Sequence, residues 1–170
     1  SNGSLTGAYG YGDFTFNGPN GSGLGYSTQE YRIINGEAKV VHSRTFTTKL
    51  VAGSRPYTYT DVSSTTTDVH YQYDQLGRLT SAQGSSYTMS ADGNSLTITT
   101  SVDQYAIING KAKLVRSDST SNSTHVNGST SRQNMTTTYS YDSVGHLTGA
   151  RGSGTFSSND GNGNVTTGAI

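Results

Sequence analysis

Four histidines are the side chains best suited to bind a metal ion or to transfer a proton in this chain of 170 residues. They are His42, His70, His125 and His146, and they lie far apart in the sequence. No His-x-x-x-His or His-Glu pairing occurs, and no cysteine is present to complete a zinc site. We therefore expect no metal site, and we interpret His70 and His146 as surface residues of strands.

Carboxylates could supply a second kind of chemistry, the acid and base pair of a glycosidase. The candidates are Glu30, Glu37, Asp68 and Asp103. Glu37 is replaced by Lys111 in the internal repeat described below, which is typical of a solvated face. No set of nucleophile, base and orienting residue recurs at a workable spacing. The sequence therefore predicts no catalytic residue, no enzymatic activity and no bound cofactor.

Glycine-rich segments could bind phosphate or calcium. Segment 9–13 lacks the Gly-Lys-Ser/Thr ending of a phosphate loop, and no helix follows it. Segment 160–164 alternates oxygen ligands like the start of a calcium loop, but Val165 replaces the glycine expected at the sixth place and no acidic closing ligand follows. We interpret both segments as turns.

Composition narrows the class of protein. Lys and Arg number 11 against 11 Asp and Glu, so the formal net charge is +0 and no basic excess favours nucleic acid or an anionic membrane. Only 30% of the residues are hydrophobic, which is too few for a large core, and no apolar run is long enough to span a membrane. Twelve Tyr among many Thr, Val and Ile nevertheless favour a folded, β-rich chain over a disordered one.

The elements that must position these side chains are repeated along the chain. The motif Tyr-x-Tyr-Asp-x-x-Gly-Arg-Leu-Thr at 71–80 returns at an offset of 68, with His146 in place of Arg78. Its members are Tyr71, Tyr73, Asp74, Gly77, Arg78 and Leu79 in one copy, and Tyr139, Tyr141, Asp142, Gly145 and Leu147 in the other. The alternating tyrosines predict a strand, and the Asp and Gly predict a turn before a returning strand.

A second repeated motif predicts tight hairpins. Asn35-Gly36 and Asn109-Gly110 each lie between β-prone runs and suit a type I′ turn. A two-residue loop pairs Ile107 with Ala112 and Tyr105 with Leu114 on one face. The equivalent side chains of the first copy are Tyr31, Ile33, Ala38 and Val40.

A third marker, Asp92-Gly93-Asn94, predicts a further turn in the second copy. We therefore expect about six short strands per copy and essentially no α-helix. The predicted fold class is all-β, an elongated, solenoid-like stack of antiparallel β-hairpins in which each unit buries a narrow apolar stripe against the next.

We divide the chain into residues 1–78, the first β repeat, and 79–146, the second. Residues 147–170 are a partial third repeat that we expect to mediate a subunit contact. The two full copies should superpose, with the extra residues near 51–56 bulging outward as a loop. The chain thus resembles a window cut from a longer array, or a unit that continues into a neighbour.

The motif at 71–80 resembles the YD repeat of the RHS family of bacterial surface and toxin proteins. The resemblance covers about 15 residues per copy, and this chain repeats near 70 residues, whereas the usual YD array repeats near 20. It implies a secreted β-hairpin scaffold, built in large relatives into a spiralling shell or an extended surface protein. It implies no catalysis, because the repeats are scaffold in that family.

The leading hypothesis is a structural segment of an extracellular fibre, filament or cell-surface adhesin stalk. Copies of the chain would assemble head to tail through β-strand contacts, with residues 147–170 pairing near the Leu5 end of a neighbour. One alternative is a fragment of an RHS-type toxin shell. Another is a carbohydrate-binding module that presents tyrosines to cell-surface glycans, for which the tyrosines outside the repeat are the candidates: Tyr9, Tyr11, Tyr57 and Tyr59.

Overall fold

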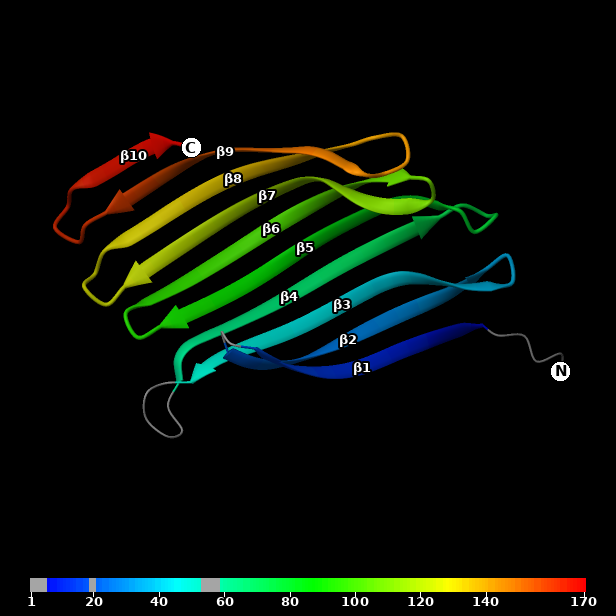
Figure 1. The fold of residues 1–170 in the computed structure, drawn as a ribbon, viewed down its shortest axis with the longest axis horizontal. Helices are drawn as coiled ribbons and strands as arrows, with labels where there is room; N and C mark the ends of the chain where they lie inside the picture. Colours follow the sequence, from blue (N-terminus) through cyan, green and yellow to red (C-terminus); the bar gives the residue numbers. More distant parts are fainter. Residues whose placement is uncertain (1–5, 19–20, 53–58) are drawn as a thin grey trace.

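A computed structural model describes residues 6–18, 21–52 and 59–170 of the chain. Ten strands form one antiparallel sheet in which each strand pairs with the next along the sequence (Figure 1). They are β1 (Gly7–Gly18), β2 (Gly21–Ile34), β3 (Glu37–Ala52), β4 (Tyr59–Tyr73), β5 (Leu79–Asp92), β6 (Ser95–Ile108), β7 (Lys111–His125), β8 (Thr130–Tyr141), β9 (Leu147–Asn159) and β10 (Val165–Ala169). The predicted all-β class, an elongated stack of antiparallel hairpins, is confirmed.

The expectation of about six short strands per copy is wrong. The described part of residues 1–78 contains four strands, β1 to β4, and residues 79–146 contain another four, β5 to β8. These eight strands are 12 to 16 residues long, because Ser and Thr run through the middle of strands such as β4, β6 and β7, and the interior glycines of β1, β2 and β5 have no positive φ and continue the strand. Strands β9 and β10 fall in residues 147–170.

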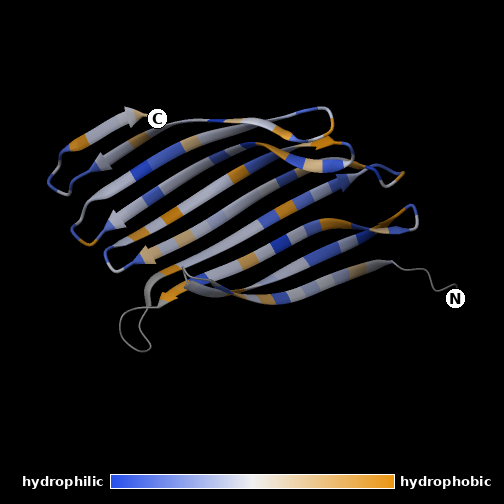
Figure 2. Cartoon of the chain, in the orientation of Figure 1, coloured by the Kyte–Doolittle hydropathy of each residue, from blue (hydrophilic) through white to orange (hydrophobic). Residues whose placement is uncertain are grey.

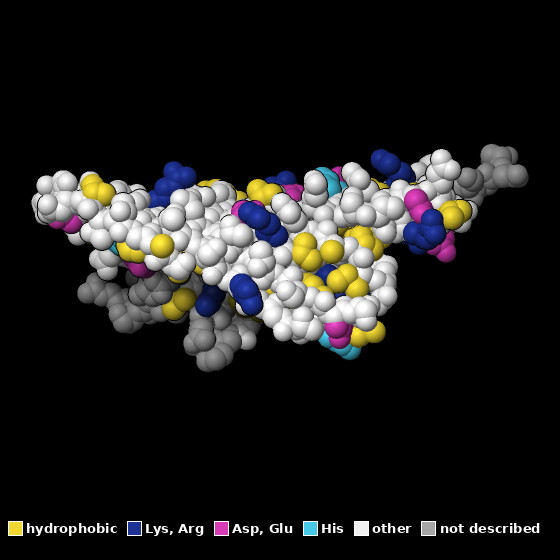
Figure 3. All heavy atoms as spheres, turned by 90° about the horizontal axis from the view of Figure 1, so that it is seen from above, with side chains coloured by type: hydrophobic (Ala, Val, Ile, Leu, Met, Phe, Trp, Pro, Cys, Tyr) yellow, Lys and Arg dark blue, Asp and Glu magenta, His cyan; other side chains and the backbone are white. Residues whose placement is uncertain are grey.

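The sheet is a single layer with little interior. Ala82, with 3% of its surface exposed, is the only hydrophobic residue of the described chain that is buried. Apolar residues form short segments separated by polar ones (Figure 2). From above, the molecule is dominated by polar uncharged side chains and backbone, with hydrophobic groups in small patches (Figure 3). Backbone hydrogen bonds and cross-strand side-chain pairs must therefore supply much of the order.

The two copies use the same register around the Asn-Gly turns. Tyr31 pairs with Val40 as Tyr105 pairs with Leu114, and each hairpin then carries one unpaired residue, Val41 or Val115. Such a β-bulge changes which side chains share a face. The sequence pattern predicts the pairs beside the turn but not the bulge. Residues 53–58, where we place most of the extra loop, lie outside the described residues.

Strand alternation divides the side chains between two faces, which we call the tyrosine face and the mixed face. The tyrosine face carries Tyr31, Tyr71, Tyr73, Tyr105, Tyr139 and Tyr141, together with most of the Ser and Thr of β3 to β7. The mixed face carries Tyr11, Tyr26, Phe46, His42 and His70, among other apolar and charged residues. No helix of the described chain is long and apolar enough to cross a membrane.

Candidate functional site

The turn after each Tyr-x-Tyr strand is built around an aspartate. Asp74 Oδ1 accepts hydrogen bonds from the amides of Leu76 and Arg78, both at 2.9 Å, and Asp74 Oδ2 accepts one from Arg78 Nε at 2.6 Å. The bond from the Arg78 amide, and after it the bond from the Arg78 side chain, hold the pKa of the Asp74 carboxyl below its usual value. Gly77 has a φ of 76°, which is the left-handed conformation that the turn requires.

The second copy forms the same turn with a different partner. Asp142 accepts bonds from the amides of Val144 at 3.0 Å and His146 at 2.8 Å, and His146 Nδ1 lies 3.0 Å from Asp142 Oδ2. His146 therefore occupies the place of Arg78 beside the aspartate. The interpretation of His146 as a strand residue is wrong, because it ends this turn immediately before β9 begins at Leu147.

The loop at 160–164 belongs to the same type. Asp160 accepts bonds from the amide of Asn162 at 2.8 Å and from the amide and Nδ2 of Asn164 at 3.1 and 2.7 Å. Its carboxylate is thus occupied by nitrogen donors, which is the arrangement of a turn. Sequence comparison of 74–78 with 160–164 could have found this likeness, because both read Asp-x-x-Gly-x.

The Asn-Gly turns adjoin these aspartate loops. Asn35 and Asn109 have φ values of 52° and 51°, followed by Gly36 and Gly110 at 80° and 74°. The Nδ2 atom of Asn109 donates to the Ser143 carbonyl at 3.1 Å, so the β6–β7 hairpin contacts the loop that follows β8. In the first copy a Cβ added at Gly77 would lie 3.1 Å from Lys39 Cε and 3.7 Å from the Ile34 carbonyl oxygen, so the β2–β3 hairpin likewise lies beside the loop at 74–78.

Tyrosine rings cover small residues on the tyrosine face. A Cβ added at Gly84 would lie 3.2 Å from Cε2 and Oη of Tyr105, so this ring lies directly over the glycine. Burial raises the pKa of the Tyr105 hydroxyl, with a further contribution from the nearby Asp103. Ala82 pairs with Tyr71 and Gly84 with Val69, which makes this the best-covered region of the sheet.

The same face carries a regular array of hydroxyl groups. Pairs on neighbouring strands lie within hydrogen-bonding distance, including Thr65 and Thr88 at 3.0 Å and Thr99 and Ser121 at 2.8 Å. Because the hydroxyls bond to one another across strands, they help to fix the register where few apolar contacts exist.

The mixed face brings together two histidines that the sequence left apart. Paired strands β3 and β4 stack the His42 and His70 rings with centroids 4.2 Å apart and planes at 3°. Asp68 Oδ1 lies 2.8 Å from His42 Nε2, and Glu30 Oε1 lies 3.6 Å from His42 Nδ1. No group of three or more His, Cys, Asp or Glu in the described part of the chain is arranged to hold a metal ion.

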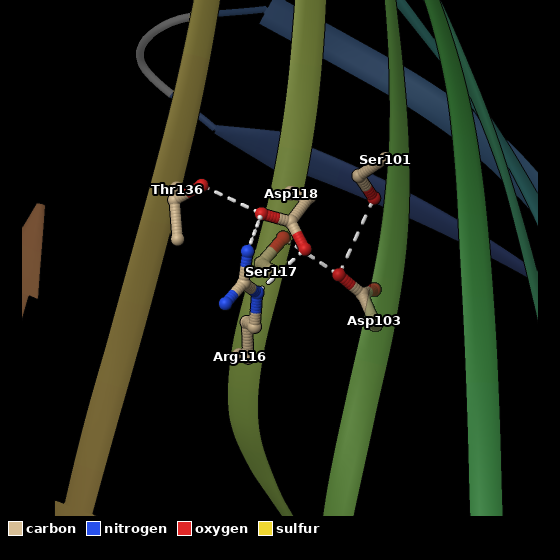
Figure 4. A network of polar contacts seen from close by, with 6 residues as sticks. All are labelled: Ser101, Asp103, Arg116, Ser117, Asp118 and Thr136. Atoms are coloured by element: carbon tan, nitrogen blue, oxygen red, sulfur yellow. Dashed lines mark hydrogen bonds and ion pairs between the residues drawn. The ribbon is translucent and has the colours of Figure 1, made fainter. Parts of the chain in front are cut away.

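In the second copy the position equivalent to His42 is occupied by Arg116. Arg116 binds Asp118 through two bonds of 2.7 and 2.9 Å, and Thr136 donates to Asp118 at 2.6 Å (Figure 4). The bonds from Arg116 and then Thr136 lower the pKa of the Asp118 carboxyl. The position is therefore polar in both copies, while its ionisable groups differ.

Two of the four candidate carboxylates share one partner, and the other two lie apart from them. Glu30 and Asp68 flank His42, whereas Asp103 accepts a bond from the Ser117 hydroxyl at 2.6 Å. Glu37 is an exposed partner of Lys39 at 2.6 Å, and this bond lowers the pKa of the Glu37 carboxyl. The predicted solvated position of Glu37 agrees with this exposure.

The structure describes the side chains of two of the four tyrosines that lie outside the repeat. Tyr9 and Tyr11 are 64% and 66% exposed, and Tyr11 stacks on Tyr26, which stacks on Phe46. Tyr57 and the side chain of Tyr59 lie outside the described part of the structure.

Comparison with protein-family models, with curated proteins and with solved structures finds no match to this chain.

Proposed function

We propose that this chain is a structural repeat segment of an extracellular fibre or cell-surface stalk, in which copies associate head to tail through β-strand contacts. One observation carries the proposal. The two full repeats form a single sheet in which β4 pairs with β5 in the same antiparallel manner as the other neighbouring strands, so a further unit extends the sheet without a new kind of interface.

Exposed strand edges support this association. β1 lies at one edge of the described sheet, and at the other edge β10 pairs only with Thr155 to Asn159 of β9. Unpaired backbone groups of an edge strand are a template for another chain. The polar faces and zero formal net charge suit a stalk that is held together by backbone pairing. The extracellular location rests on this polar composition and on the resemblance to YD repeats.

The test compares assembly of three proteins by electron microscopy and sedimentation. We expect the full chain to form filaments and the variant Ala150→Lys, which places a charge beside the exposed edge of β9, to remain unassembled. Val126→Ser is the matched control, because Val126 is 79% exposed in the loop between β7 and β8, neither of which is an edge strand. Filaments of Ala150→Lys, or none of the full chain, would contradict the proposal.

A carbohydrate-binding role is the second candidate, and it is supported by the stacked row of Tyr11, Tyr26 and Phe46 on the mixed face. Aromatic rings of this kind can stack on sugar rings. Binding to a glycan array that is lost in Tyr11→Ser would favour this role, and an array without signal would exclude the glycans it displays.

A further inference from the structure

The described sheet is a single layer, and the chain leaves a large surface exposed. Its mass is 17.9 kDa and its accessible surface is 11137 Å². A compact monomer of this mass exposes about 8,000 Å², so the excess is about 3,000 Å². A stable interface between two proteins needs about 800 Å² from each partner. Half of the excess, which is the share of one face, already exceeds this area.

The mixed face has an apolar centre. All the exposed large hydrophobic side chains of the two central strands lie on it: Tyr87 and Met89 of β5, at 44% and 38% exposure, and Leu96 and Val102 of β6, at 41% and 60%. The register places them there, because Tyr87 pairs with Thr66, which pairs with Phe46. The tyrosine face of the same strands instead presents Ser and Thr side chains whose hydroxyls already bond to one another.

Opposite charges lie on either side of this apolar centre. One row of paired residues crosses the mixed face from Glu30 on β2, through Gln83 and Gln104 on β5 and β6, to Arg151 on β9. The Glu30 side chain is 60% exposed, and Arg151 is also exposed. β2 and β9 are each three strands from the central pair of strands. The face is therefore acidic and basic at equal distances from its middle.

We propose that the mixed face is the interface of a two-fold dimer, in which two copies of this chain pack their sheets face to face. A two-fold axis parallel to the strands, between β5 and β6, brings the apolar side chains of these strands together. The same axis places β2 of one copy over β9 of the other, with Glu30 near Arg151. The two sheets lie about 10 Å apart, the usual distance between packed sheets. The inference goes beyond the proposed function, because it uses a face of the sheet and leaves the strand edges free.

Two carboxylates of the face meet across this axis, and each has a counter-ion of its own. Asp68 on β4 lies over Asp118 on β7. Asp118 is bound by Arg116 at 2.7 and 2.9 Å, and Asp68 contacts His42 at 2.8 Å and Arg44 at 3.7 Å. Their repulsion is therefore compensated within each chain. A second copy fits this face better than a uniformly acidic or basic partner, which would meet a like charge at Glu30 or at Arg151.

The first experiment measures the dimer dissociation constant of the full chain by sedimentation equilibrium, below the concentration at which filaments form. We expect Met89→Lys, which places a charge in the apolar centre, to raise the constant by about tenfold or more. Ser90→Lys is the matched control, because Ser90 is exposed on the opposite face of the same strand. It should change the constant by less than about threefold. Circular dichroism of both variants reports separately on folding.

The second experiment tests the two-fold register by charge reversal. Glu30→Arg and Arg151→Glu should each raise the dissociation constant by about tenfold, because the dimer contains this contact twice. The double variant should return the constant to within about threefold of the unmodified chain. β2 and β9 are seven strands apart in one chain, so this rescue can arise only between two chains.

A chain that is monomeric at every concentration below filament formation would leave the mixed face to another partner and overturn the inference. A dimer that Met89→Lys and Ser90→Lys weaken equally, or a double variant that stays as weak as the single ones, would also overturn it. Dimers that never grow into filaments would retain this inference and refute the proposed function. Filaments of a single layer, without contact between mixed faces, would do the reverse.

Discussion

Replacing Gly84 by alanine should weaken the sheet, while the same change at Gly152 should strengthen it. Two effects oppose each other at Gly84. Alanine restricts the unfolded chain, which stabilises the fold by about 0.4–1 kcal/mol. The new Cβ would lie 3.2 Å from the Tyr105 ring and 3.3 Å from the Asp68 carbonyl oxygen, so the ring or the backbone must move. Overpacking of this kind costs about 1–3 kcal/mol, and it outweighs the first effect by about 1 kcal/mol.

At Gly152 only the first effect operates, because the nearest atom is the end of the flexible Met135 side chain at 3.4 Å. The two substitutions should therefore differ by about 2 kcal/mol in the free energy of unfolding. Urea unfolding followed by tyrosine fluorescence would show this as midpoints about 1 M apart, given the usual dependence on urea for a chain of this size. Equal shifts of the same sign at both positions would refute the assignment of Gly84 as the residue that the Tyr105 ring covers.

Two further predictions concern the turns. Gly110→Ala should lower the free energy of unfolding by about 1–2 kcal/mol in urea, because φ is 74° at this position. Gly93→Ala is the control and should change stability by less than about 0.5 kcal/mol, because this turn glycine has no positive φ and has open space around it. Equal costs at the two positions would contradict the turn geometry. Lowered carboxyl pKa values contribute stability that is present above the ordinary value of 3.8 and lost as pH falls through the lower folded values. The urea concentration at the unfolding midpoint should therefore decrease as the pH is lowered from 5 to strongly acidic values, and a midpoint that increases over this range would refute the assignment. The carboxyl groups with lowered pKa values are those of Asp74, Asp92, Asp118, Asp142 and Asp160.

Turn chemistry and two-residue alternation made part of this fold predictable. Asn109 and Gly110 need positive φ values that few other residues adopt, so the turn and the pairs Ile107 with Ala112 and Tyr105 with Leu114 follow from local sequence. Strand length did not follow, because the Ser and Thr in the middle of β6 and β7, and the glycines in the middle of β1 and β5, occur in both strands and loops. The bulge at Val115 did not follow either, since no special residue marks it.

Contacts between distant strands were beyond the sequence. His42 and His70 meet only because the β3–β4 register places them opposite each other, and the connection between those strands is too long for a turn rule to fix that register. The position of the Tyr105 ring over Gly84 depends in the same way on the β5–β6 register. An aspartate loop, by contrast, is local, and its recurrence at 160–164 was visible in the residues.

Fibre diffraction from oriented assemblies of the full chain tests the central claim most directly. Strands in a sheet lie about 4.7–4.9 Å apart, so ten strands added per subunit give an axial repeat of about 48 Å when copies extend one continuous sheet. The account predicts both the strand spacing and this longer repeat along the fibre axis. The account would be contradicted by assemblies in which the strand-spacing reflection is perpendicular to the fibre axis, or by a chain that stays monomeric at high concentration.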